Sequence, residues 1–172
     1  MDTQSSYIGS GDLKFHPSLS AFLMQKEYVF SGDRGIFSEY EASGDLGIRA
    51  QGTDLLSAVA AAAHGLVASL LPPETVRYVE VRTISAQGRD DQEMIVNFLN
   101  DMLFLIYGHR WLPKYIKTLI LHENWQIEAS LVGEPLAPER HHIDREIKAV
   151  TYHNLSIVQE PGRVTIDLLC DL

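Results

Sequence analysis

The chain has 172 residues, of which 45% are hydrophobic and 22% are charged, and this balance is typical of one globular domain with a sizeable core. Its 14 lysines and arginines against 23 aspartates and glutamates give a formal charge of -9, spread along the chain without an acidic tail or a basic arm. Nucleic-acid binding depends on clustered cations that neutralise phosphates, so no direct strong nucleic-acid binding is expected, and an acidic chain is better suited to docking on a basic partner.

A single cysteine, Cys170, cannot form an internal disulfide, which fits a reducing cytosol. Its leucine neighbours predict a buried, inert thiol. The first residues lack the basic and apolar segments of a signal peptide, and no apolar run approaches the ~20 residues that span a bilayer. We therefore expect a cytoplasmic protein with no membrane association.

Residues 1–34 are polar and interrupted by glycines, with two short apolar islands. This composition predicts an N-terminal extension, flexible or loosely docked, before a single domain at 35–172. From Ile36 onward, apolar and polar residues alternate over 36–42 and again over 46–50, with Gly44-Asp45 between the two runs. The alternation predicts two strands.

A first helix is predicted to follow, with Thr53 as its N-cap and Asp54 near the positive end of the helix dipole. Pro72-Pro73 ends it. The run Ala60–Ala63 allows a sheet to approach closely. The predicted apolar face consists of Leu55, Val59, Ala62, Ala63, Leu66 and Leu70.

A strand over Val76–Ile84 is predicted to precede a second helix. Asp90 and Glu93 have the spacing of a capping box, and Gly108 stands where a C-terminal cap belongs. The apolar face of this helix consists of Ile95, Phe98, Leu99, Met102, Leu103 and Ile106.

The remaining chain predicts two hairpins. Tyr115–Leu121 and Trp125–Val132 form the first, which Gly133-Glu134-Pro135 ends, and a charged connection follows over Pro138–Arg145. Glu146–Val158 and Arg163–Leu172 form the second, around Pro161-Gly162. The predicted fold class is α+β in two layers, an open and mostly antiparallel sheet with two main helices packed on one face.

Two acidic positions are candidate ligands for a hard cation such as Mg, Mn or Ca, which prefer oxygen donors. Asp45 interrupts two apolar runs, although a solvated turn residue is the favoured interpretation from the residues alone. Asp171 and Leu172 place a side-chain carboxylate beside a main-chain carboxylate, and they form a strong site only with a third carboxylate nearby. The alternative is an ordinary frayed end.

Lys148, Thr151, Tyr152 and His153 lie together on a predicted strand. A lysine or histidine on an exposed face can contact a phosphate or a partner carboxylate, whereas spacing alone favours Tyr152 at the sheet rim and solvated polar residues.

The pair His141-His142 raises the alternative of a zinc site. Adjacent side chains of an extended chain point to opposite sides and no second zinc-ligand motif is present, so a solvated loop is favoured.

The run Glu146–His153 resembles the signature segment of the archease family, which keeps a Lys-Ala-Val/Ile-Thr-Tyr-His-like sequence shortly before its C-terminus. Leu99–Leu105 is similar to the family's Leu-Asn-Glu-Leu-Leu-like helix. Gly133-Glu134 and Arg140-His141 reproduce a third family pattern, and the resemblance covers roughly 36–172.

The resemblance implies a small acidic accessory protein, not itself an enzyme, that assists RtcB-type RNA ligases in tRNA splicing and RNA repair. In the family, the Asp of a His-Thr-Ala-Asp motif binds a divalent metal together with the final Asp and the terminal residue. These ligands align with Asp45, Asp171 and Leu172. Here Ala42-Ser43-Gly44 replaces His-Thr-Ala, and loss of such supporting groups typically changes metal affinity or activity ~10- to 100-fold.

The leading hypothesis is therefore an archease-like protein that holds Mg, Mn or Ca and promotes GTP-dependent guanylylation and multiple turnover of an RtcB-type ligase. Lys148 and His153 are secondary candidates for partner contact. One alternative is a stand-alone metal-dependent phosphoesterase, which the absence of a clear base or nucleophile disfavours. Another is a diverged, metal-free protein-binding module of the same fold.

Overall fold

The computed structural model describes residues 26–29 and 36–172. The rest of the predicted N-terminal extension lies outside the described residues, while Lys26–Val29 forms an edge strand. The elements are β1 (Lys26–Val29), β2 (Ile36–Ala42), β3 (Asp45–Gly52), α2 (Leu55–Leu70), η1 (Pro73–Thr75), β4 (Glu80–Gln87), α3 (Asp91–Tyr107), β5 (Trp111–His122), η2 (Glu123–Trp125), β6 (Gln126–Pro135), β7 (Ala149–Glu160) and β8 (Arg163–Asp171).

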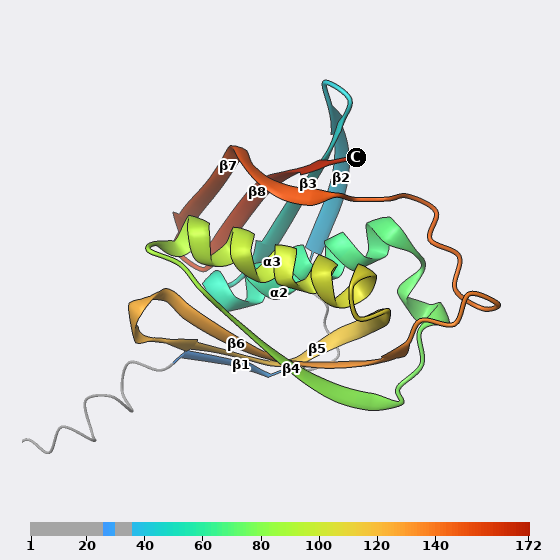
Figure 1. The fold of residues 1–172 in the computed structure, drawn as a ribbon. Helices are drawn as coiled ribbons and strands as arrows, with labels where there is room; N and C mark the ends of the chain where they lie inside the picture. The colour runs from blue at the N-terminus through green and yellow to red at the C-terminus, as the bar shows by residue number, and fades with distance from the viewer. Residues whose placement is uncertain (1–25, 30–35) are drawn as a thin grey trace, which may run out of the picture.

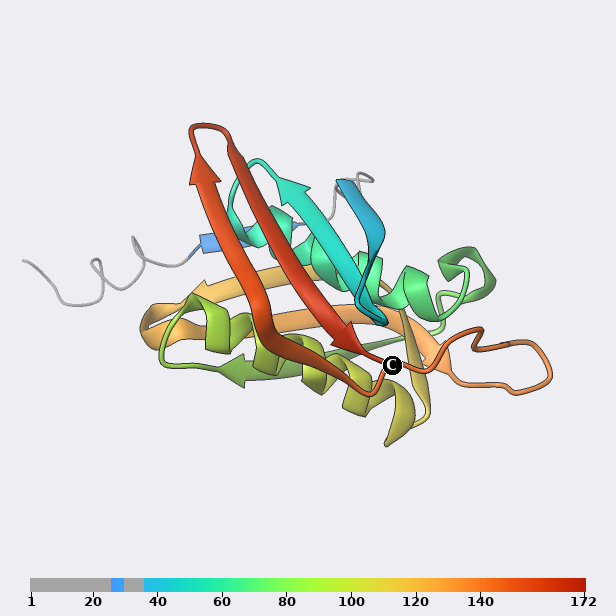
Figure 2. The same cartoon turned by 90° about the horizontal axis from the view of Figure 1, so that it is seen from above.

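The strands form two antiparallel sheets with the two long helices between them (Figure 1). One sheet has the order β1-β5-β6-β4 and the other β2-β3-β8-β7. Helix α2 contacts β2, β3 and β8 on one side and β1 and β5 on the other, and α3 contacts β7 as well as β4, β5 and β6. Figure 2 shows the second sheet lying across the helices.

The predicted α+β class, the antiparallel pairing and the two main helices are confirmed. The expected single sheet is in fact two sheets, one on each side of the helices. The physical reason lies in α2, which is alanine-rich and buried around most of its circumference. Small side chains on several faces allow it to pack against two layers at once.

Both helices begin at an aspartate. At α2 the N-cap is Asp54, one residue later than the predicted Thr53, because Asp54 Oδ1 accepts from Ser57 N (2.8 Å) while Ser57 Oγ accepts from Asp54 N (3.0 Å). At α3 the cap Asp90 accepts from Glu93 N (2.8 Å), but the Glu93 carboxylate accepts from Arg89 N (2.7 Å). The capping box predicted at α3 is therefore only half formed.

Strand boundaries differ from the predicted ones where tertiary contacts intervene. β4 begins at Glu80 and not at Val76, because a 3-10 turn precedes it and Lys114 Nζ donates to the carbonyl of Val76. β6 continues through Gly133 to Pro135, where a turn was expected, because these residues still pair with β5. The final hairpin forms as predicted. None of the helices in the described part of the chain is long and apolar enough to cross a membrane.

Candidate metal centre at a sheet corner

The pairing of β3 with β8 brings the two predicted aspartate ligands to one corner of the sheet. The antiparallel register ends with Leu46 opposite Cys170, so Asp45 and Asp171 are the next residues along the two strands. Leu46 and Cys170 are buried against the helices, so the alternation along each strand points both aspartates to the outer face.

A tight turn fixes Asp45 as the first residue of β3. Ser43 (φ 53°) and Gly44 (φ 93°) both have left-handed backbone, as a two-residue hairpin turn of the primed kind requires. Ala42 pairs with Asp45 across this turn. Ala42, which aligns with the histidine implied by the resemblance, is thus the direct cross-strand neighbour of Asp45.

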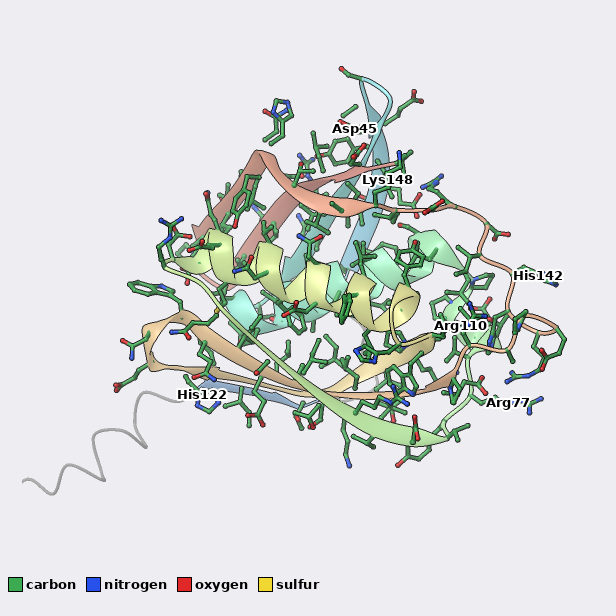
Figure 3. The ribbon with its side chains drawn as sticks, in the orientation of Figure 1. Asp45, Arg77, Arg110, His122, His142 and Lys148 are labelled. Carbon is green, nitrogen blue, oxygen red and sulfur yellow. The ribbon has the colours of Figure 1, made fainter. Side chains whose placement is uncertain are left out.

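Lys148 binds the end of β8 at two points. Its backbone N–H donates to the carbonyl of Asp171 (2.9 Å), and its Nζ donates to the main-chain oxygen of Leu172 (2.6 Å). Figure 3 shows Lys148 and Asp45 at the same end of this sheet. The corner therefore contains a cation beside its carboxylates.

A hollow of about 350 Å³ opens beside Asp45 and Leu172. Arg145 also lines it, and its Nη1 donates to Glu39 Oε2 (3.2 Å), while Ser69 donates to the other oxygen of Glu39 (2.7 Å). These bonds tie β2 to α2 and to the connection that precedes β7. The full lining is Glu39, Tyr40, Glu41, Gly44, Asp45, Leu46, Arg145 and Leu172.

Tyr40 covers the outer face next to the corner. Its ring lies so close to Gly47 that a Cβ at that glycine would be 2.3 Å from a ring atom, so the glycine is required for this close approach. Partial burial raises the pKa of the Tyr40 hydroxyl, and the carboxylate of Asp167 adds to the effect. Asp167 itself pairs with Arg49 (2.7 Å).

The donor chemistry fits a hard divalent cation. Two side-chain carboxylates and the main-chain oxygen of Leu172 offer oxygen alone, the donor type that Mg, Mn and Ca prefer. Within residues 26–29 and 36–172, no three His, Cys, Asp or Glu side chains come close enough together to hold a metal. An ion held here would accordingly need a Leu172 carboxylate and water as further ligands.

His153, the other predicted contact residue, lies away from this corner. Between Thr151 and Ser156, β7 bulges out of register with β8, and exposed Tyr152 and His153 lie in that bulge. The hollow is lined by neither His153 nor Lys148, and of the two predicted aspartates it is lined by Asp45 and not by Asp171. Lys148 is nevertheless bonded to the end of β8, whereas His153 lies in the bulge of β7.

The interpretation of His141 as part of a solvated loop is wrong, because its side chain is fully buried against Glu134. The Glu134 carboxylate receives hydrogen bonds from Arg140 Nη2 (2.6 Å) and from the backbone N–H of Arg77 (2.6 Å), and His141 Nε2 lies 3.1 Å away. His141 Nδ1 accepts from Ala137 N (2.9 Å), so the other ring nitrogen carries the proton. The Arg140 hydrogen bonds lower the pKa of Glu134 to about 2. His142 is exposed, as predicted.

Sequence reasoning also missed the role of Asn100. Its side-chain amide makes a reciprocal pair with Val150 in β7, donating to the carbonyl and accepting from the N–H, both at 2.9 Å. Helix α3 thereby holds the strand that leads to Lys148. The only signal in the sequence was the resemblance of Leu99–Leu105 to a family helix.

Comparisons with known proteins agree on one family. A model described as "Archease protein family (MTH1598/TM1083)" matches residues 37–172. A protein archease of Pyrococcus abyssi is 32% identical over 139 residues, covering 79% of this chain and 98% of that protein. A protein archease of Methanopyrus kandleri is 35% identical over 121 residues, covering 69% of this chain and 84% of that protein.

Solved structures show the same fold. The solution structure of Methanobacterium thermoautotrophicum protein 1598 has a TM-score of 0.67 at 23% identity, covering 81% of this chain and all of that one. A Thermotoga maritima crystal structure, described as an archease and possible chaperone, has a TM-score of 0.56 at 16% identity with the same coverage. Since the family match spans most of the sequence, this chain belongs to the archease family.

Proposed function

We propose that this chain binds a divalent ion and acts as an accessory protein that promotes GTP-dependent guanylylation and multiple turnover of an RtcB-type RNA ligase in tRNA splicing or RNA repair. The single observation that supports the proposal is the pairing of β3 with β8, whose final pair, Leu46 opposite Cys170, is next to Asp45 on one strand and next to Asp171 on the other. The ligase is the partner implied by the family to which the chain belongs.

In this proposal Asp45, Asp171 and the Leu172 carboxylate hold Mg, Mn or Ca. A bound ion would supply positive charge for stabilising phosphate oxygens. Because Asp171 is exposed and Asp45 is partly exposed, an ion held by them would face solvent. The backbone N–H of Lys148 is bonded to the end of β8, its ammonium group competes with an ion for the Leu172 oxygen, and both Lys148 and His153 are secondary candidates for ligase contact.

The charge of the chain supports a protein partner. A net charge of -9 opposes contact with RNA phosphates and favours a basic surface, which an RNA-processing enzyme provides. We accordingly assign RNA binding and bond formation to the ligase.

The test is multiple turnover by a sub-stoichiometric RtcB-type ligase supplied with GTP, Mn and a nicked RNA. The wild-type chain is expected to raise turnover. Asp45→Ala and Asp171→Ala are expected to abolish this increase. Both variants should also lose Mn binding, measured by calorimetry. Asp144→Ala is the matched control, since Asp144 is exposed and lies outside the hollow. Unchanged turnover with the wild-type chain would refute the accessory function.

Two observations favour a second candidate, a metal-free module that still docks on the ligase. Ala42 offers no imidazole beside Asp45, and Lys148 already neutralises the oxygen of Leu172. Under this alternative the wild-type chain stimulates the ligase without binding Mn, and Asp45→Ala has no effect on turnover. Under the leading proposal, Ala42→His is expected to strengthen Mn binding by ~10-fold, the lower end of the ~10- to 100-fold that supporting groups typically contribute.

A further inference from the structure

Helix α3 lies between β4 and β7, an edge strand of each sheet. It forms more hydrogen bonds with the backbone at β7 than with the backbone of β4. At β7, Asn100 pairs with both backbone groups of Val150, and the N–H of Ile147 donates to the Tyr107 hydroxyl (3.1 Å). β4 is the last strand of its sheet, and within the residues that the structure describes no strand pairs with its outer side. The only side chain of α3 that bonds to its backbone is Asn97, which donates to the carbonyl of Gln87 at its end (2.8 Å).

A groove of about 400 Å³ runs between this edge and α3. Four consecutive β4 residues, Arg82–Ser85, form one wall, and side chains of α3 form the other. Figure 1 shows β4 at the border of its sheet, alongside α3. A strand edge facing a helix is the arrangement in which extended peptides add to a sheet. The remaining lining residues are Asp101, Phe104, Leu105 and His109.

Exposed apolar side chains lie in the groove and on its strand, among polar ones. Phe104 is 62% exposed, and its ring meets the His109 ring edge-on (5.1 Å between centroids). Val81 is 44% exposed. Free edges are commonly protected by charged side chains, proline or a bulge. β4 keeps a regular register with β6 over eight residues and contains no lysine or proline, and its charged residues are Glu80 and Arg82.

The charges in the groove favour a partner segment that carries a positive charge. Arg82 is already neutralised by Glu80 (2.9 Å) and lies over the Trp111 ring (5.2 Å). Asp101 forms no ion pair with any residue that the structure describes, and partial desolvation raises the pKa of its carboxyl. A cation brought by a partner would stabilise the ionised carboxylate.

We propose that the edge of β4 accepts an extended segment of a basic protein partner, which adds to the four-stranded sheet as a fifth strand. An apolar side chain of the segment packs on Phe104 and Leu105, and a lysine or arginine pairs with Asp101. The main-chain bonds to β4 provide affinity, and these two side-chain contacts provide specificity. This surface is separate from the metal corner, so its test is independent of the ligase proposal.

The probe is a displayed library of random octapeptides selected on the full-length chain, followed by synthesis of the most enriched peptide. Selected sequences are expected to alternate apolar residues and to carry a lysine or arginine at one fixed position. The bound peptide should slow amide hydrogen exchange along β4 and leave β7 unchanged. Phe104→Ala should weaken binding about tenfold, as for a central aromatic anchor, and Asp101→Asn about two- to fivefold, as for a partly exposed ion pair.

Two variants serve as matched controls. Tyr152→Ala removes an exposed aromatic residue of the other sheet, and Asp144→Asn removes a charge on an exposed loop. Neither should alter peptide binding. The proposal is overturned if no peptide is enriched, if binding ignores Phe104→Ala, or if protection appears away from β4. Concentration-dependent dimerisation with protection of β4 in the absence of peptide would also overturn it, by identifying a second copy as the occupant.

Discussion

Two acidic regions of this molecule use their carboxylates in opposite ways. Glu134 is buried and accepts hydrogen bonds from a guanidinium, a backbone N–H and an imidazole. Asp45 and Asp171 lie at an exposed strand end, and within the described part of the chain neither side chain accepts a hydrogen bond from another residue. A carboxylate with saturated oxygens stabilises the fold, whereas one with open oxygens is available for a ligand.

The same contrast separates the three family patterns in the sequence. Gly133-Glu134 and Arg140-His141 also resemble the family, yet Glu134, Arg140 and His141 form a fixed internal network. Resemblance alone marks both regions as important without distinguishing folding from function. The two roles are distinguished by whether the carboxylate oxygens already accept hydrogen bonds from the protein.

Removing Glu134 should have the largest effect on stability. Glu134→Ala leaves Arg140 and buried His141 without their shared acceptor, and we expect the free energy of unfolding to fall by roughly 3 kcal/mol. Urea denaturation would measure the change, with exposed Glu74→Ala as the control. A loss below about 0.5 kcal/mol, the range of ordinary surface substitutions, would contradict the saturated-network interpretation.

Acid should weaken the same network. The pKa of Glu134 is lowered from 4.5 to about 2, so its contribution is complete above pH 4.5 and is lost as the pH falls toward 2. The stability difference between wild type and Glu134→Gln is expected to narrow across that window. Denaturant midpoints at a series of pH values would show it, and a difference that stays constant down to pH 2 would exclude this carboxylate as the titrating group.

Asn100→Ala tests whether α3 holds the strand that leads to the corner. Two hydrogen bonds to Val150 are lost, and we expect a stability loss of about 1–2 kcal/mol with faster exchange of the Val150 amide. Asn97→Ala removes one bond to β4 and is the control for β7. Equal amide exchange rates at Val150 in both variants would show that Asn100 does not hold β7 in place.

The smallest expected effect is at Lys148. Lys148→Ala frees the main-chain oxygen of Leu172 from an ammonium group, so Mn affinity should rise about two- to fivefold with little change in stability. Lys117→Ala, an exposed lysine of the other sheet, is the control. Calorimetric titration that shows weaker Mn binding would mean that Lys148 organises the site instead of competing for it.

The hairpins and helices were predictable because their information is local. Alternation over β2 and β3, the apolar faces of α2 and α3, and Pro161-Gly162 all act within a few residues. The division into two sheets was not predictable, since it depends on which faces of α2 are covered by strands distant in the sequence. The burial of His141 was missed for the same reason, because its environment is set by β6 and the loop before it.

The candidate metal corner was only half predictable. Sequence and resemblance selected Asp45 and Asp171, but only the pairing of β3 with β8 shows that both are next to one cross-strand pair, Leu46 and Cys170. The pairing of Lys148 with the end of β8 had no sequence signal beyond its place in the signature segment. Aspartates that can bind a metal can be identified in a sequence, whereas a lysine that competes for the same oxygen atoms is identified only from the structure.

Cys170 offers a way to observe this corner without altering it. The lone thiol lies in β8 next to Asp171, fully buried, and its burial raises its pKa to about 12. A thiol reagent can therefore modify it only when β8 separates from its neighbours, because the reactive thiolate is otherwise both inaccessible and scarce. The rate of alkylation of the native protein therefore measures how often β8, the strand that carries Asp171, opens locally.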